Sequence, residues 1–356
     1  MTSLERISRF LKRTPIDRIG VFEHLWGSTQ KRWIDEGMPP EYSVSDYFNY
    51  DIEECWAFNL VADLDFNTKI ISETDETITL LDGNGATLRR HKLHDSTPEH
   101  IDFAVKDQKG YYELIRPYLT PDERRINFEG YRYIQDIAKK QNKFFFWSGV
   151  NAFESMHPVS GHEYMLMGMA LEPDWIKEMA MDYAKLTVSL MEILFSKEGK
   201  PDGIWFYEDM GFKNRPFISP AMYEEIIMPA HIYTIDYAKS IGLPVLMHSC
   251  GFVEPLIPGM LKAGIDCLQV IEIKAGMDLL KLHKDFGDRL SLMGGIDVRT
   301  LYSNDIPTIE KELISKIPVV KNGFGYCLHS DHSIPETVSF ESYKYFVERA
   351  LELGTY

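Results

Sequence analysis

The sequence LPVLMHSCGF, from Leu243 to Phe252, joins an apolar run to side chains that can bind a metal ion. The apolar run is typical of a buried strand. It follows a helix-length segment that begins at Ser219-Pro220, an N-cap residue followed by a proline suited to the first helical position. Side chains alternate along a strand, so His248 and Cys250 should leave on the same side. An imidazole beside a thiolate suits a borderline-soft ion such as zinc.

The same order of a helical segment and then a short apolar run repeats along the chain from about residue 101. The apolar runs are FFFWSG, GIWFYED, VLMHSC, CLQVIE, RLSLMGGID and GFGYCLHSD. With one or two more strands in the N-terminal third, they indicate an α/β protein with a parallel sheet and helical crossovers. A closed (β/α)8 TIM-type barrel fits the count best, and a doubly wound open sheet is the alternative.

The first hundred residues follow a different pattern. A helix is predicted from about Leu4 to Lys12, and the segment TKIISETDETITLLDGNGATLRRHKL alternates apolar and polar residues around the turn 82–85. That alternation about Asp-Gly-Asn-Gly is a hairpin signal. We expect residues 1–100 to include a helical and β-hairpin elaboration that caps the barrel, and residues 1–356 to form a single domain.

Composition limits the partners. The formal net charge of −16 argues against nucleic-acid phosphates and anionic membrane surfaces. No apolar run has the length of a membrane span, and the first residues resemble an amphipathic helix, so we expect a cytoplasmic protein. The four cysteines are too few and too scattered for a disulfide framework, which favours reduced thiols.

Polar residues recur where the predicted strands end, and in a barrel these ends meet at one mouth. Alternation along GIWFYED places Tyr207 and Asp209 on one face and Glu208 on the other. We therefore expect Asp209 to bind substrate or to transfer a proton. Glu208 is expected to bind substrate, either from a position that supports the metal ligands or as a fourth ligand of the ion. The alternative is a surface Glu-Asp pair. His24, His231 and His283 are expected to be surface or packing residues.

These features together resemble the uroporphyrinogen decarboxylase superfamily, and within it the zinc-dependent corrinoid methyltransferases. The resemblance runs from about Thr14 to Gly354. It rests on the segments TPIDRIGVFE, FESMHPVSG, EDMGFKNRPFISPAMYEEIIMP, HSCGFVEPLIPGMLKAGIDCLQ and CLHSDHSIPETVSFESY. Their order and spacing are specific for the superfamily and less specific for the reaction. The group includes methylcobamide:coenzyme M methyltransferases and methoxy-aromatic O-demethylases.

The resemblance implies a set of metal ligands. The zinc signature of the family is His-x-Cys followed, on a much later strand, by one Cys, which His248, Cys250 and Cys327 match. Three protein ligands would leave one tetrahedral position for the substrate, as in a catalytic zinc site. The alternative is that these cysteines and the histidine are unrelated.

The resemblance also implies pocket residues. Glu154, in the segment that follows FFFWSG, is expected to be catalytic, with His157 of the same segment binding substrate; the alternative is a solvated loop. Asp297 resembles a residue at the pocket edge, or it caps the next helix. His332, in DHSIP, matches a pocket segment and is expected to be catalytic, and His329 is expected to bind substrate. A polar loop with a hydrogen-bonded histidine is the alternative.

The expected activity is therefore zinc-dependent methyl transfer between a small molecule, either a thiol or a methoxy or methylamine compound, and a corrinoid. The chain lacks the Asp-x-His-x-x-Gly motif of corrinoid-binding domains, so the corrinoid should be carried by a separate protein. It also lacks the arginine-rich N-terminal segment with which uroporphyrinogen decarboxylases handle porphyrinogen carboxylates. A metal-independent decarboxylase and a non-catalytic barrel that binds tetrapyrroles or corrinoid proteins are the alternatives. A homodimer is compatible with these expectations.

Overall fold

The protein is a closed barrel of eight parallel strands, as seen in a computed structural model that describes residues 1–93 and 97–356. The strands follow one another around the barrel in chain order, and every neighbouring pair is parallel. They are β1 (Gly20–Val21), β2 (Ile52–Trp56), β7 (Phe144–Val150), β8 (Gly203–Tyr207), β11 (Val245–Ser249), β12 (Cys267–Val270), β13 (Ser291–Gly294) and β14 (Tyr326–Leu328). The prediction of a (β/α)8 barrel is confirmed.

The barrel closes between its first and second strands. The backbone N–H of Asp51, just before β2, donates to the carbonyl of Val21 in β1 at 2.9 Å. On its other side β1 pairs with β14, where Gly20 lies opposite Cys327. β1 and β2, the two ends of the strand order, thus meet through this hydrogen bond, and within the described residues no strand ladder joins them.

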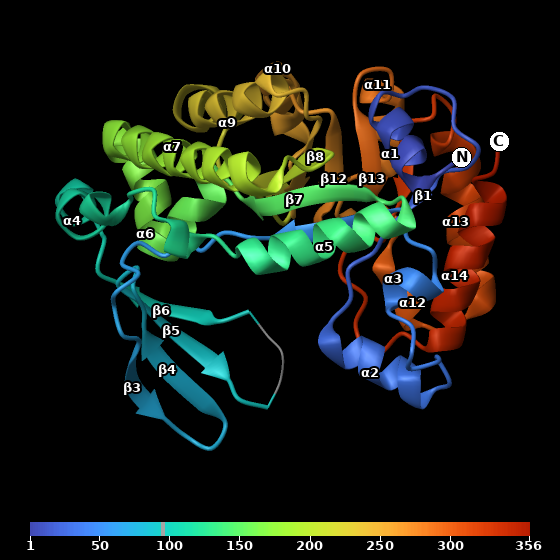
Figure 1. Ribbon diagram of the computed structural model, residues 1–356, viewed down its shortest axis with the longest axis horizontal. Coiled ribbons are helices and arrows are strands. Elements are labelled where there is room, and N and C mark those ends of the chain that lie inside the picture. The colour runs from blue at the N-terminus through green and yellow to red at the C-terminus, as the bar shows by residue number, and fades with distance from the viewer. Residues whose placement is uncertain (94–96) are drawn as a thin grey trace.

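Helices surround the barrel and form the crossovers that parallel strands require. In the ribbon view, α7, α9 and α10 cover one side of the barrel, and α13 and α14 cover the side where both termini lie (Figure 1). The helices are α1 (Ser3–Leu11), α2 (Gly27–Asp35), α3 (Val44–Tyr47), α4 (Gln108–Leu114), α5 (Phe128–Gln141), α6 (Ala152–Leu171), α7 (Pro173–Glu198), α8 (Pro220–Met222), α9 (Met228–Ser240), α10 (Ile257–Ala263), α11 (Leu279–Phe286), α12 (Val298–Tyr302), α13 (Ile306–Val320) and α14 (Phe340–Leu353). None of the helices within the described residues has the length and apolar character needed to cross a membrane.

The predicted hairpin is part of a four-stranded antiparallel sheet inserted between β2 and α4. Its strands are β3 (Lys69–Glu73), β4 (Thr77–Leu81), β5 (Ala86–His91) and β6 (Glu99–Phe103), and the expected turn joins β4 to β5. The sheet extends away from the barrel below α6 (Figure 1). A smaller hairpin, β9 (Gly211–Phe212) with β10 (Arg215–Pro216), follows β8.

The sheet meets the barrel at a kink in α6. Gly161 has φ +62° inside this helix, a conformation that glycine adopts readily, and Pro158 precedes it. A Cβ on Gly161 would lie 2.3 Å from Cε2 of Phe103 in β6. The missing side chain therefore lets the sheet approach α6 closely. The segment of Glu154 and His157 is therefore not the solvated loop given as the alternative, because α6 begins at Ala152.

Candidate functional site

A pocket of about 240 Å³ opens at the carboxyl ends of the barrel strands. Its lining comes from strands or strand ends around most of the barrel, which is the usual position of active sites in this fold. The lining residues are His24, Glu54, Trp56, Tyr207, His248, Cys250, Gln269, Val270, His329, His332 and Ser333. Both residues of the predicted His-x-Cys pair are among them.

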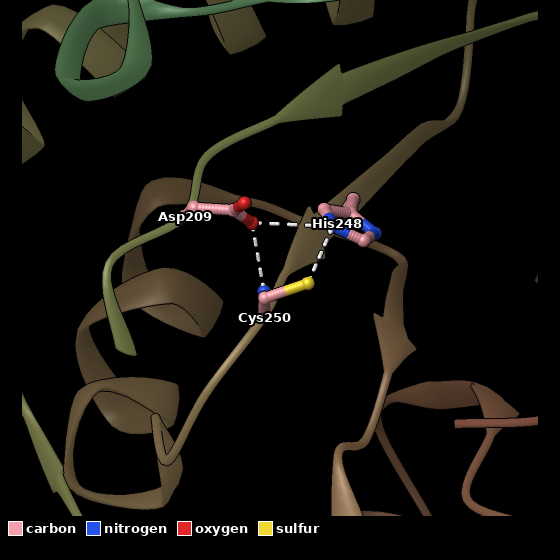
Figure 2. A group of neighbouring side chains, drawn as sticks. All are labelled: Asp209, His248 and Cys250. Carbon is pink, nitrogen blue, oxygen red and sulfur yellow. Dashed lines mark hydrogen bonds and ion pairs between the residues drawn. The ribbon is translucent and has the colours of Figure 1, made fainter. Parts of the chain in front are cut away.

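Three side chains converge at one wall of this pocket. Nε2 of His248 lies 3.2 Å from Sγ of Cys250 and 3.1 Å from Oδ1 of Asp209. Figure 2 shows that Asp209, which follows β8, points toward the two residues at the end of β11. One nitrogen, one sulfur and one oxygen thus lie within 4.8 Å of one another, a spacing that could hold a metal ion. The predicted alternation along both strands is confirmed for these residues.

The ring of His248 is fixed by Gln269 of β12. Nδ1 of His248 is hydrogen-bonded to Oε1 of Gln269, while Nε2 of Gln269 lies 3.3 Å from Nε2 of His329. Because an amide oxygen only accepts, Nδ1 of His248 donates to it. Nε2 of His248 faces Cys250 and Asp209; burial opposes the charge on the ring, but the charges and hydrogen bonds of these two residues raise the pKa of His248 well above its ordinary value. Metal-binding histidines commonly use such a partner on the second ring nitrogen.

The loop after His248 is held by two carboxylates. Oδ1 of Asp209 accepts the backbone N–H of Cys250 at 2.9 Å, and Oε2 of Glu272 accepts that of Gly251 at 2.6 Å. Gly251 has φ +79°, and a Cβ there would lie 2.2 Å from the carbonyl carbon of Gly211. Only glycine fits this contact, so the position of Cys250 depends on Gly251.

The charge on Asp209 is stabilised by its neighbours. Burial favours the neutral acid, but the charge and hydrogen bond of His248, together with the backbone N–H of Cys250, lower the pKa of Asp209 to about 2. For the thiol of Cys250, burial outweighs His248, and its pKa is raised. Asp209 is thus an anion at neutral pH, which favours a cation beside it.

The prediction that Cys327 is the third ligand is wrong for this structure. Cys327 is fully buried in β14 and does not belong to the cluster of Asp209, His248 and Cys250. A Cβ on Gly20 would lie 2.9 Å from Sγ of Cys327 and 2.7 Å from the side chain of Ile7 in α1. The thiol therefore packs deep in the barrel, where burial raises its pKa well above the ordinary value. His329, two residues later, lines the pocket instead.

The prediction that Glu208 binds substrate is also wrong. Glu208 is fully buried, and its carboxylate accepts the backbone N–H groups of Phe153 at 3.1 Å and Glu154 at 2.7 Å. Nε2 of His231 lies 2.6 Å from the same carboxylate. Glu208 therefore anchors the amino end of α6, where a negative charge is favourable. This matches the prediction that only Asp209 of the pair enters the mouth.

Asp297 does not line the pocket either. Its carboxylate accepts the backbone N–H of Arg299 as the N-cap of α12 and forms a 2.7 Å ion pair with the Arg299 guanidinium. The structure therefore shows the capping alternative, and the prediction of a substrate-binding role is wrong.

Glu154 and His157 lie in the first turns of α6, beside the metal-binding cluster. Oε1 of Glu154 is 3.6 Å from Nδ1 of His157, and its buried Oε2 has no hydrogen-bond partner. Burial first, and then the charges of Asp209 and Glu208, raise the pKa of Glu154 to about 8. A carboxyl group that stays protonated at neutral pH can donate a proton to a substrate. This property fits the catalytic role expected for Glu154, which stays a prediction.

His329 and His332 both line the pocket, as expected for functional residues. Nδ1 of His329 lies 2.6 Å from the carbonyl of Ser330, to which it donates. Burial first, and then the nearby His24, lower the pKa of His329 well below its ordinary value. His329 is therefore neutral at physiological pH. The roles of His329 and His332 stay predictions.

The sequence did not predict that several other residues line the pocket, among them His24, Glu54, Trp56 and Gln269. His24 was expected to be a surface or packing residue, and that expectation is wrong. A signal was present for Gln269, which is the polar residue of the otherwise apolar and buried strand CLQV. Polar residues inside buried strands need partners, and at the carboxyl end of a barrel strand the partners include substrates.

The raised pKa of Glu154 makes stability depend on pH. A carboxyl group with a folded-state pKa near 8 stabilises the fold below its unfolded value of about 4.5, and this contribution is lost as the pH rises through 8. Between about pH 4.5 and pH 8, we expect the free energy of unfolding of the metal-free protein to fall less steeply in Glu154→Gln than in the parent. The two slopes should differ by up to about 1.4 kcal/mol per pH unit. Urea unfolding at several pH values tests this, and equal slopes in parent and variant would contradict it.

Comparison with known proteins places the chain in a family. The uroporphyrinogen decarboxylase (URO-D) family profile matches residues 156–353, more than half of the chain. A methyltransferase from Methanosarcina mazei has a similar structure, with a TM-score of 0.70 over 99% of both chains and 15% sequence identity. A 2,3-dimethylmalate lyase is much less similar, with a TM-score of 0.33, 9% identity and coverage of 94% of this chain and 80% of its own. No curated protein matches. The chain belongs to the uroporphyrinogen decarboxylase family.

Proposed function

We propose that this protein is a zinc-dependent methyltransferase that moves a methyl group between a small molecule and a corrinoid carried by a separate protein. The observation that carries the proposal is the convergence of Asp209, His248 and Cys250 on one wall of the pocket at the barrel mouth. The fold is similar to that of the Methanosarcina methyltransferase along the whole chain, which supports the proposal of a methyltransferase rather than a decarboxylase within the family.

The donor set fits zinc. Zinc in proteins binds nitrogen, thiolate sulfur and carboxylate oxygen, and three protein ligands are usual in catalytic sites. Asp209 is anionic, and Nε2 of His248 and Sγ of Cys250 would lose their protons on binding the ion. When bound, zinc would act as a Lewis acid toward a substrate heteroatom or thiol. Asp209 replaces Cys327 in the predicted ligand set.

The composition of the pocket argues against the decarboxylase alternative. No arginine or lysine is among the described residues that line it, whereas a porphyrinogen carries many carboxylates that need cationic partners. A pocket of about 240 Å³ suits a small molecule better than a tetrapyrrole. We infer that the corrinoid approaches the mouth from outside while the small substrate occupies the pocket.

Two measurements test the proposal. Metal analysis of the purified protein should find about one zinc per chain, which a chelator removes. Absorbance should report methyl exchange when free methylcobalamin is mixed with a small thiol such as 2-mercaptoethanol, or cob(I)alamin with a methoxybenzoate, and the rate should fall when zinc is removed. Exchange that is equally fast without metal would contradict the zinc dependence. Binding of cobalamin with no exchange in either direction would contradict the activity.

A further inference from the structure

The inserted antiparallel sheet has one covered edge and one open edge. At the covered edge β6 lies against α6, where the ring of His100 is 4.5 Å from the ring of His157 and Phe103 packs on Gly161. The open edge is β3, the strand farthest from α6 in the ribbon view (Figure 1). Among the residues that the structure describes, no strand pairs with the outer side of β3. Such an edge presents backbone N–H and C=O groups on which another strand can pair.

The open edge is also apolar at its centre. β3 has the sequence Lys-Ile-Ile-Ser-Glu, and all five of its residues are exposed. Ile70 is 60% exposed and Ile71 is 57% exposed, so two large apolar side chains stand next to one another on this strand. Single exposed apolar residues are common on protein surfaces. An open edge strand that carries two of them is instead a site where association is expected.

The charges at the two ends of β3 favour one way of pairing. Lys69 and Glu73 lie two residues before and two residues after Ile71. When two copies of β3 pair antiparallel about Ile71, each Lys69 lies opposite the partner's Glu73. In a parallel pairing in register, like charges would lie side by side. Opposite charges across two strands stabilise the pair and like charges destabilise it. The edge is therefore complementary to itself under a two-fold rotation, which is the symmetry of most homodimers.

Two features of β3 could blunt this edge. The ladder with β4 skips Ile71, which is a β-bulge, and Glu73 forms a 2.9 Å ion pair with Lys92 of the same chain. Bulges and charges are used to prevent pairing at sheet edges. In this chain the strand remains continuous over its five residues despite the bulge, and it contains no proline. The ion pair with Lys92 is exposed and therefore weak, so it leaves Glu73 able to bind a second cation.

We propose that β3 is an interface between two copies of this chain, which pair antiparallel about Ile71 and join their four-stranded sheets into one continuous sheet. One short strand buries less surface than the roughly 1,200 Å² of a stable interface, so the dimer is weak and its population rises with protein concentration. No residue of β3 lines the pocket at the barrel mouth. The proposal is therefore independent of the reaction that the pocket performs.

The first test measures association of the full chain by sedimentation equilibrium. The parent should change from monomer to dimer as its concentration rises to about 1 mM, the weak end of specific affinities. Ile71→Lys should stay monomeric, because two lysines would meet at the two-fold axis. Ile101→Lys is the matched control, since Ile101 is 42% exposed in β6 of the same sheet, and this change should leave association as in the parent. A parent that stays monomeric throughout would overturn the proposal, and β3 would then be free for a strand of another protein.

The second test exchanges the charges at low ionic strength. Lys69→Glu alone and Glu73→Lys alone should each weaken dimerisation roughly tenfold or more, because each change places like charges opposite one another at both ends of the interface. An equal mixture of the two variants should dimerise about as well as the parent, since every glutamate of one chain then faces a lysine of the other. Circular dichroism checks that both variants are folded. A mixture that dimerises no better than the separate variants would overturn the antiparallel pairing.

A cysteine on the two-fold axis tests the register directly. In Ile71→Cys the two introduced thiols would lie opposite one another, so mild oxidation should give a covalent dimer, whereas Ile101→Cys should give none. The parent measures the background, because three of its cysteines are buried and Cys250 is partly exposed. If the parent dimerises but Ile71→Lys dimerises equally well and Ile71→Cys does not cross-link, the interface lies elsewhere and the proposal fails.

Discussion

Replacing Cys250 with alanine should abolish zinc binding and methyl transfer, whereas replacing Cys327 with alanine should leave about one zinc per chain. Sγ of Cys250 lies 3.2 Å from Nε2 of His248 at the pocket wall, while Cys327 packs beside Gly20 inside the barrel. Loss of one of three protein ligands removes the site. Loss of the buried thiol leaves a small cavity and should cost about 1 kcal/mol of stability.

Metal analysis and thermal unfolding with and without added zinc distinguish the two variants. An ion that binds only the folded state stabilises it by about 2.7 kcal/mol at a concentration 100 times its Kd, so zinc should raise the Tm of the parent and of Cys327→Ala. It should not raise the Tm of Cys250→Ala. Loss of zinc in both variants would mean that Cys327 reaches the ion, as the family signature predicted, and would contradict the ligand set with Asp209.

The contrast between these cysteines shows what the sequence could predict. The period of two along a strand correctly placed His248 with Cys250, and Tyr207 with Asp209, on the sides that face the pocket. It could not give the depth of Cys327. Residues on different strands reach the same level only through the tilt and stagger of the barrel, which the spacing within one strand does not encode.

The position of His24 was missed for a related reason. β1 has only two residues, Gly20 and Val21, so its apolar run gave a weak strand signal, and the residues beyond it could not be placed at the mouth. The pairing of β1 with β14 is the contact that brings His24 to His329, across 305 positions of the sequence. Local patterns predict elements, whereas such contacts depend on closure of the whole sheet.

Closure of the barrel also depends on a buried network at the opposite end of the strands. Asp51 has no exposed side-chain surface and lies 2.6 Å from Nη1 of Arg6 in α1 and 2.8 Å from Nη1 of Arg18. Its Oδ2 also accepts the backbone N–H of Val21 at 2.9 Å, next to the hydrogen bond that joins β1 to β2. One carboxylate thus connects the helix before the barrel, the first strand and the second strand.

Asp51→Ala should therefore lower the free energy of unfolding by about 3–5 kcal/mol, because it leaves the buried Arg6 guanidinium without this partner and removes an acceptor from β1. Urea unfolding followed by circular dichroism measures the change. Glu99→Ala is the control, since Glu99 and Arg89 form an exposed pair on the antiparallel sheet, and its loss should cost less than about 1 kcal/mol. Equal, small effects of both substitutions would contradict the role assigned to Asp51, because the seam between β1 and β2 would then hold without its charge.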